Sequence, residues 1–542
     1  MEYSLTVVTN NLLDVIPLIG LYAETHFRFW IPFSRYFKKE PELIFDTPWR
    51  LEPGQDLTFF LVVKDAHTYP TMLDSVEIEV YQNEKMITTQ KWVLDKKVQE
   101  MQSDFEFTIS KPQLPSGEIT VFPRLNYSIS GKQCQMLVDN YSQTQKDPLR
   151  ITISDSCLPS LEGWLAGDTH LHTSLTNDQI EFGASLRQTR MAAKRLGLDF
   201  ITATDHSYDL DDDPSDYLQN DPDLTKWHQS RKLINNMNLD SAPTIIPGEE
   251  ISVFNRRGAT VHFLHYNDPI YFPGSGDSGE DWPKLSSEIS IDDVLSQRSP
   301  NTISVGAHTG YRFPFLQRLL LKRGHWEDAD HNNPDLDGVQ ILSGSPSYIA
   351  FHTSRQLWID ALLRGKKLAV YGGSDGHGNF NRNWHIKLPV WSMGTSEDQI
   401  FGQCRTLVKS DSAMVDDLTR AMKQRRTALS TGPVGDLNII SGNAVSGVGD
   451  TVQANKGDQL EVRVIGHSST EFGEEMDFTL YLGDLYNQEE TILSHFSEKS
   501  DMFEMSIELS ASSNAYVRLE ISSEGSRWPG IYLSSPIWID VD

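Results

Sequence analysis

Hydrophobic and polar residues alternate in short runs over two separate parts of the chain. Near the start, runs such as 56–63 and 118–122 are rich in β-branched and aromatic residues and are bounded by Pro, Gly and Asn. Near the end, 459–464 alternates in the same way. Alternation with a period of two predicts strands with one buried face. We therefore predict an Ig-like β-sandwich over 41–157 and a second β-sandwich over 436–542.

Between these parts, apolar runs alternate with amphipathic helical patterns. Leu186, Thr189, Ala193 and Leu196 follow helical spacing, Gly197 then marks a helix end, and 198–204 is nearly continuously apolar. Similar apolar runs occur at 244–247, 260–264, 302–305, 338–342 and 367–371. The alternation predicts a central α/β barrel over 158–435. Residues 1–40 are rich in aromatic residues, and we interpret them as an N-terminal extension.

Composition places the chain among multi-domain globular proteins and limits its partners. It has 542 residues, of which 38% are hydrophobic, and a formal net charge of −28. An acidic surface repels phosphate backbones, so nucleic acid is an unlikely partner, whereas bound cations would still allow a small anionic substrate. The acidic run 209–213 is most simply a solvated loop.

The cysteines and the N-terminus bear on the compartment. Cys134, Cys157 and Cys404 show neither disulfide nor metal-finger spacing. The first residues lack a basic segment, and the apolar stretch 12–22 contains Asp14 and Pro17. These features predict no signal peptide, no membrane association and a cytoplasmic location.

The histidines are concentrated in the central region: twelve of the 16 lie between His170 and His385. His170 and His172 are one residue apart on an extended segment, which points both rings to one face. Two such rings can share a metal ion. Taken alone, this pattern is better explained by a pair of surface or core histidines.

Further polar residues follow the apolar runs at the positions where catalytic groups converge in βα barrels. They are Asp205, His206, Glu249, Glu250, His262, His308, Asp375 and His377. His262 also fits a hydrogen-bonded core histidine. The coincidence of so many strand-end ligands predicts a metal site.

The order HxH, TDH, PGxE, HxxxY, AH and GSDxH resembles that of the PHP (polymerase and histidinol phosphatase) superfamily, and its CehA/McbA-like branch in particular. The resemblance spans about 163–435. It implies a distorted (β/α)7 barrel that holds two or three divalent ions, commonly Zn, Mn or Fe. The ligands it implies are His170, His172, His206, Glu250, His262, His308, Asp375 and His377. A further ligand falls at Asp178, although Asn177 occupies the more usual offset.

The resemblance gives Asp205 a supporting role, and the chemistry of a metal site suggests roles for other residues. Asp205 would orient its neighbours, and Glu249 would point away from the metals because adjacent strand residues face opposite sides. His308 or His206 would assist the leaving group as an acid. Arg256 and Arg257 would clamp an anionic substrate, but a pair of exposed loop arginines is the more common explanation.

Three functions fit these observations. The first is a phosphoesterase that cleaves a small phosphorylated substrate with a metal-activated hydroxide. The second is a metal-dependent hydrolase of a carbamate, carboxylic ester or amide. The third is a non-catalytic metal-binding or interaction module, which the large, oxygen-rich and cysteine-free ligand set disfavours.

Overall fold

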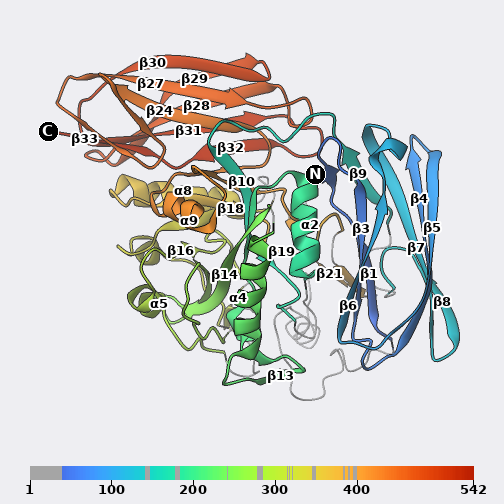
Figure 1. Ribbon diagram of the computed structural model, residues 1–542. Coiled ribbons are helices and arrows are strands. Elements are labelled where there is room, and N and C mark those ends of the chain that lie inside the picture. The colour runs from blue at the N-terminus through green and yellow to red at the C-terminus, as the bar shows by residue number, and fades with distance from the viewer. Residues whose placement is uncertain are drawn as a thin grey trace.

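The structure is a computed structural model (Figure 1). It describes residues 40–140, 147–177, 183–240, 242–276, 285–313, 315, 318–319, 322–344, 349–382, 385–388, 391–394 and 399–542. The extension expected over 1–40 lies outside these residues, apart from residue 40, and so does Asp178.

The N-terminal part consists of two β-sheets that share one core. One sheet contains β1 (Glu42–Asp46), β3 (Leu57–Lys64) and β6 (Gln102–Ile109). The other contains β2 (Arg50–Leu51), β9 (Leu149–Ile153), β7 (Gly117–Ile129), β4 (Thr71–Gln82), β5 (Lys85–Val98) and β8 (Lys132–Met136). Phe45 and Leu61 from the first sheet pack with Val76 and Val121 from the second. The expected β-rich character of this part is confirmed.

The central part is built around a row of neighbouring strands. In order they are β10 (Trp164–His172), β11 (Phe200–Ala203), β14 (Thr244–Phe254), β15 (Thr260–Tyr266), β16 (Ile303–Gly306), β17 (Gly338–Ser343) and β18 (Ala369–Gly373). The short strand β19 (Gly376–His377) follows β18 and pairs with β10, with His172 opposite His377. The end of the row therefore returns to its first strand.

The predicted alternation of strands and helices is interrupted between β14 and β15. β14 and β15 pair antiparallel, and the turn 255–259 joins them without a helix. Parallel neighbours need a crossover of a dozen or more residues, so five residues between two strands allow only a hairpin. The row of strands therefore departs from regular β/α alternation at this hairpin, and the distorted (β/α)7 barrel stays a prediction.

Helices pack around these strands (Figure 1). They are α2 (Leu186–Leu196), α3 (Ser207–Leu210), α4 (Thr225–Asn238), α5 (Ile291–Gln297), α7 (Asp328–His331), α8 (Ile349–Leu363) and α9 (Val415–Lys423). In α2, Ser185 caps the N-terminus by accepting a hydrogen bond from the backbone N–H of Gln188. Gly197 ends this helix with a left-handed φ of 81°. The helix and its glycine stop were both predicted from the sequence.

The central strands continue into the C-terminal part through β22 (Arg405–Lys409) and β23 (Thr427–Ser430). β23 pairs with β32 (Gly530–Ser534), which is followed by β31 (Ala515–Ser523), β28 (Glu475–Asp484) and β29 (Glu489–Lys499). A second sheet contains β25 (Ala444–Gly447), β24 (Val434–Ser441), β27 (Gln459–His467) and β30 (Met502–Ser510). The other described strands are β12 (Asp212–Asp213), β13 (Asp216–Asn220), β20 (His385–Leu388), β21 (Trp391–Gly394), β26 (Thr451–Ala454) and β33 (Ile537–Val541). One continuous sheet thus crosses the boundary expected near residue 435.

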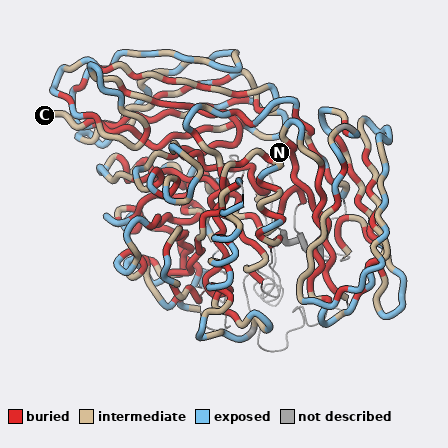
Figure 2. Tube along the Cα trace, in the orientation of Figure 1, coloured by how far each residue is buried: buried red, intermediate tan, exposed pale blue. Residues whose placement is uncertain are grey.

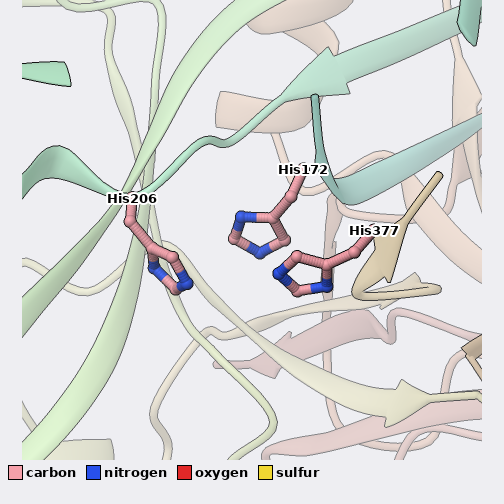
Figure 3. A group of neighbouring side chains, drawn as sticks. All are labelled: His172, His206 and His377. Atoms are coloured by element: carbon pink, nitrogen blue, oxygen red, sulfur yellow. The ribbon is translucent and has the colours of Figure 1, made fainter. Parts of the chain in front are cut away.

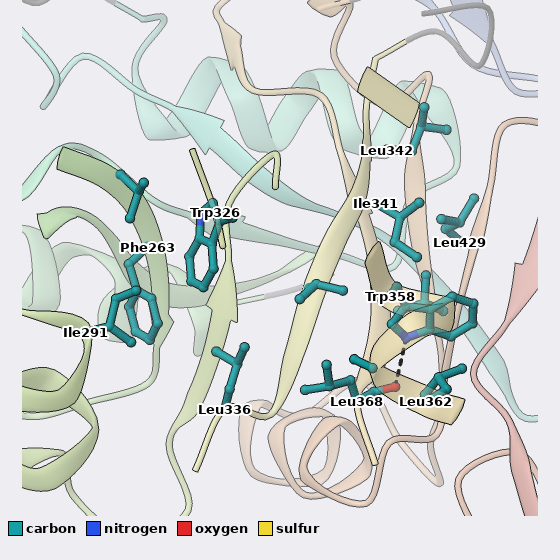
Figure 4. Packing of buried hydrophobic residues seen from close by; sticks show 14 of the residues in the cluster. Phe263, Ile291, Trp326, Leu336, Ile341, Leu342, Trp358, Leu362, Leu368 and Leu429 are labelled. Atoms are coloured by element: carbon teal, nitrogen blue, oxygen red, sulfur yellow. Dashed lines mark hydrogen bonds between the residues drawn. The ribbon is translucent and has the colours of Figure 1, made fainter. Parts of the chain in front are cut away.

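Buried residues concentrate between the layers (Figure 2). In the central core, the Trp358 indole N–H donates to the backbone oxygen of Leu368 at 3.1 Å (Figure 4). Leu342 and Leu429 pack into the same cluster. Burying each leucine side chain stabilises the fold by about 1.5–3 kcal/mol, and together such residues fix the strands whose ends carry the polar residues.

A fully buried arginine connects the two flanking β parts. Arg50 Nε lies 2.9 Å from Glu471 Oε2, and Arg50 Nη2 donates to Ser154 Oγ at 3.0 Å. Arg50 also pairs with Glu52. Because these partners satisfy the buried guanidinium, the contact joins the N-terminal sandwich to the C-terminal part.

Two further sequence expectations can be compared with the structure. Asp209 and Asp212 are buried, so the acidic run 209–213 is not the solvated loop that we expected. The three cysteines are free. Within the described residues, no helix is both long enough and apolar enough to cross a bilayer.

Candidate metal centre

The end of β10 carries the two histidines of the HxH pattern. His170 and His172 are both buried, and their Nε2 atoms approach the same two carboxylates. The predicted orientation of both rings to one face is confirmed.

A buried aspartate fixes β10 against the segment after β18. Asp168 Oδ1 accepts from the backbone N–H groups of His170 at 3.2 Å and Ser374 at 3.0 Å, and Asp168 Oδ2 accepts from that of Gly402 at 3.0 Å. Gly373 is required here, because a Cβ atom on it would lie 2.7 Å from His170 Cβ. This close approach brings Asp375 beside His170.

Four donor atoms form the first candidate group: His170 Nε2, His172 Nε2, Glu250 Oε2 and Asp375 Oδ1. The oxygens lie 3.2 Å from His170 Nε2, and 3.1 and 3.3 Å from His172 Nε2. Ligands about 2.0 Å from a tetrahedral zinc ion are about 3.3 Å apart. These measured distances therefore fit the edges of a metal tetrahedron.

The other oxygen of Glu250 belongs to a second group, with His262 and His308. Glu250 Oε1 lies 3.0 Å from His262 Nδ1 and 3.3 Å from His308 Nε2. A carboxylate with ligand partners on both oxygens is suited to bridging two cations.

A third group is formed by His172, His206 and His377 (Figure 3). The rings of His172 and His377 stack at 4.1 Å between centroids. This group contains no carboxylate from the described part of the chain. Together, the three groups bring all eight ligands implied by the resemblance into one cluster.

The segment after His172 contacts the N-terminal sandwich. Asn177 is buried and its side-chain oxygen accepts a hydrogen bond from Lys64, the last residue of β3. Lys64 is itself buried. The N-terminal sandwich thus contacts the segment that follows His172.

Two of the candidate ligands have left-handed backbones. The φ angles are 28° at His308 and 55° at Asp375. Such conformations cost non-glycine residues of the order of 1–3 kcal/mol and persist where the surroundings impose them, often at functional sites.

Two supporting residues were not found from the sequence. Gln340 Oε1 lies 2.9 Å from His170 Nδ1 and accepts from the backbone N–H of His308 at 3.0 Å. Thr176 Oγ1 lies 3.2 Å from His172 Nδ1. The signal for Gln340 was its polar side chain inside the apolar run 338–342, whereas nothing in the pattern marked Thr176.

Asp205 and Glu249 lie beside the cluster without joining it. Asp205 Oδ1 accepts from the backbone N–H groups of Thr173 at 2.6 Å and Thr176 at 2.9 Å, so it shapes the segment that holds His172. Glu249 Oε1 accepts from Trp227 Nε1 at 2.6 Å and Arg231 Nη2 at 2.7 Å. Glu249 therefore points away from the histidines, as predicted.

The electrostatics of the cluster favour cations. Burial lowers the pKa values of His170 and His172, but the Glu250 and Asp375 carboxylates outweigh it and raise both to about 9. Burial also lowers the pKa of His206 well below its usual value, and nearby His172 adds to this. A divalent ion bound here would supply the positive charge that protons on His170 and His172 supply in its absence.

The hydrogen bonding of the histidine ring nitrogens also fits metal binding. The buried Nε2 atoms of His170 and His172 and both ring nitrogens of His206 make no hydrogen bond to described residues. Buried polar atoms are nearly always hydrogen-bonded, so this convergence of unsatisfied nitrogens suits a shared cation.

Arg256 and Arg257 lie apart from the three groups. They occupy the turn between β14 and β15, where Arg256 faces Asp292 at 3.9 Å and Arg257 faces Glu327 at 3.1 Å. Their proposed contact with a substrate stays a prediction, as do the acid roles of His206 and His308.

Comparisons with known proteins do not identify the chain. No family model and no curated protein matches it. Similar solved structures include a glycosyl hydrolase family 2 member from Bacteroides cellulosilyticus, with 10% identity and a TM-score of 0.18 over 92% of this chain and 78% of that one. A β-glucuronidase from Parabacteroides merdae has 9% identity and a TM-score of 0.17 over 92% and 64% of the two chains. Scores this low carry no argument about fold or function.

Proposed function

We propose that this protein is a metal-dependent hydrolase that cleaves a small phosphorylated substrate. The observation that carries the proposal is the position of Glu250 between two candidate ligand groups, with one oxygen 3.1 Å from His172 Nε2 and the other 3.0 Å from His262 Nδ1. A bridged pair of cations is a common arrangement for displacement at phosphorus.

The chain's own residues would hold the ions in a prepared geometry. His170, His172 and Asp375 supply one nitrogen- and oxygen-rich set with Glu250, and His262 and His308 supply the other. Divalent ions bound there would lower the pKa of water and neutralise negative charge on the attacked group. Gln340 and Asp205 would keep the rings and the adjoining loop in place.

Two observations support a phosphate ester as the substrate. The order of the ligand motifs along the chain resembles that of PHP phosphoesterases. In addition, a protein with a net charge of −28 needs local cations to attract a phosphate dianion, and this cluster would provide them. Zinc fits the four-donor group by its distances, and manganese or iron would suit the same atom types.

The test is metal content and turnover measured together. We expect the purified full-length protein to contain divalent metal and to hydrolyse an aryl phosphate, and a chelator should abolish the activity reversibly. Asp375→Asn and His170→Ala should lose metal and turnover. Turnover of aryl esters or carbamates without turnover of phosphates would replace the phosphoesterase proposal. Full metal occupancy without any turnover would favour a binding module.

A further inference from the structure

A second candidate site lies outside the three histidine groups. An open pocket of about 450 Å³ is lined by Arg256, Arg257, Arg312, Glu327, Asp328 and the apolar surfaces of Trp326, Ala329 and Leu357. We call it the arginine pocket. None of the candidate metal ligands lines it.

The charge of this pocket is opposite to that of the chain as a whole. Three arginines line it although the formal net charge of the protein is −28. Glu327, which pairs with Arg257, is also the acidic group that acts on the charge of Arg312. Burial lowers the pKa of Arg312, and the neighbouring Arg318 adds to this although Glu327 opposes it. The pocket therefore holds three guanidinium groups against two carboxylates, those of Glu327 and Asp328.

The other two arginines have weak partners. Arg257 Nη2 lies 3.1 Å from Glu327 Oε2, but the Arg257 side chain is 74% exposed. Arg256 Nη2 is 3.9 Å from Asp292 Oδ1, and both side chains are at least half exposed. Exposed ion pairs contribute only about 0–1 kcal/mol, so a bound anion can replace them at little cost.

The backbone around the arginines is held in place. Asp330 Oδ1 accepts from the backbone N–H of Arg256 at 3.2 Å, and Asp330 Oδ2 accepts from that of Glu327 at 3.0 Å. Asn255 Oδ1 accepts from the N–H groups of Arg257 at 2.9 Å and Ala259 at 3.0 Å. Asp330 thus connects the turn that carries Arg256 and Arg257 to the segment that carries Glu327 before any ligand binds. This order lowers the entropic cost of binding.

The position of the pocket separates it from the metal centre. Arg256 lies six residues beyond Glu250, beyond the end of β14. At about 3.3 Å per strand residue, the four steps from Glu250 to the end of the strand alone span about 13 Å. Since no candidate metal ligand lines the pocket, the two sites are separate.

We propose that the arginine pocket binds a phosphate group of a small molecule, separate from the group that occupies the metal centre. Guanidinium groups match phosphate oxygens with paired, charge-assisted hydrogen bonds. The phosphate is either the distal group of a bisphosphorylated substrate or that of an independent ligand. The substrate alternative rests on the proposed function, whereas binding of phosphate itself does not.

The first experiment measures phosphate binding by calorimetry to the purified full-length protein. We expect a class of phosphate binding that Asp375→Asn leaves in place and that Arg312→Gln weakens at least tenfold, without a change in metal content or unfolding temperature. Arg463→Gln is the control, because Arg463 lies outside the pocket, has a side chain that is 42% exposed and lies 3.3 Å from a glutamate, Glu461. Equal weakening by both variants, or no weakening by Arg312→Gln, would overturn the proposal.

The second experiment separates the two sources of the phosphate with a long alkanediol bisphosphate as the probe. If the pocket holds a distal substrate group, the probe should bind more tightly than orthophosphate, and both Arg312→Gln and Asp375→Asn should remove that gain. If the pocket binds a ligand that is independent of the substrate, Arg312→Gln alone should weaken binding of the probe in the pocket. Binding affected only by Asp375→Asn would contradict both alternatives.

Discussion

The side chain of Gln340 supports the ring of His170: Gln340 Oε1 lies 2.9 Å from His170 Nδ1. Because an amide oxygen only accepts, the Nδ1–H must donate, and in the neutral ring the lone pair of Nε2 then faces Glu250 and Asp375. This contact fixes both the tautomer and the orientation of a candidate ligand.

Replacing this support should weaken metal binding without removing a ligand. We expect Gln340→Leu to lower metal affinity by about 10–100-fold, which is typical for loss of a partner behind a ligating histidine. Competition with a chromogenic chelator measures the change. Gln453→Leu is the control, since Gln453 is exposed on β26. Unchanged affinity in Gln340→Leu would contradict the assigned role.

Neutralising Glu250 and neutralising its neighbour Glu249 should have different effects on metal content. Glu250→Gln should lower metal content by more ions per chain than Asp375→Asn, because Glu250 belongs to two groups and Asp375 to one. Glu249→Gln should retain its metal but unfold at a lower temperature, since Glu249 accepts from Trp227 and Arg231. Elemental analysis and thermal unfolding test both points. Equal metal loss in the two glutamate variants would refute the bridging geometry.

Metal binding should depend on pH because protons compete for the same nitrogens. The pKa values of His170 and His172 are raised from 6.5 to about 9 by Glu250 and Asp375, in spite of burial. Between these values, metal affinity should rise by about tenfold per pH unit for each proton displaced. The metal-free protein should show the opposite trend: the stabilisation is complete below pH 6.5 and is lost as the pH rises through 9. Chelator competition measures the first trend and thermal unfolding measures the second, both from pH 6 to 9.5. A metal affinity that does not change with pH would contradict competition between protons and metal.

Gly373 should tolerate no side chain. In Gly373→Ala, the added methyl group would lie 2.7 Å from His170 Cβ and His170 N, so the strands must separate. We expect a loss of about 1–3 kcal/mol in stability and a reduced metal content. Gly447→Ala should be nearly neutral, since the nearest atom to its added methyl is 3.5 Å away. Wild-type metal content in Gly373→Ala would show that this close approach does not position Asp375.

The sequence allowed prediction of the features that depend on local pattern. Helix α2 follows from its periodic apolar residues and from Gly197, and the strand-end histidines follow from their positions after apolar runs. The hairpin of β14 and β15 was missed because both runs resemble buried strands of a parallel sheet. In the structure β14 extends to Phe254, which leaves only five residues before β15 and requires the antiparallel pairing.

Contacts between distant segments could not be predicted from one sequence. Thr176 supports His172 only because Asp205, 29 residues further along the chain, shapes the loop between them. Lys64 and Asn177 meet across 113 residues, from two different parts of the fold. Residue types and local spacing do not encode such pairings, which arise when whole sheets pack.

The hydrogen bonds between β23 and β32 have a practical consequence for dividing this protein. Ala428, Leu429 and Ser430 pair with Ser534, Leu533 and Tyr532. A fragment that stops near residue 435 would leave the β23 edge without its partner, and open edges of this kind recruit other chains. The last hundred residues are therefore needed to complete the sheet of the central part. Truncation near residue 435 should yield aggregated protein instead of a smaller folded protein.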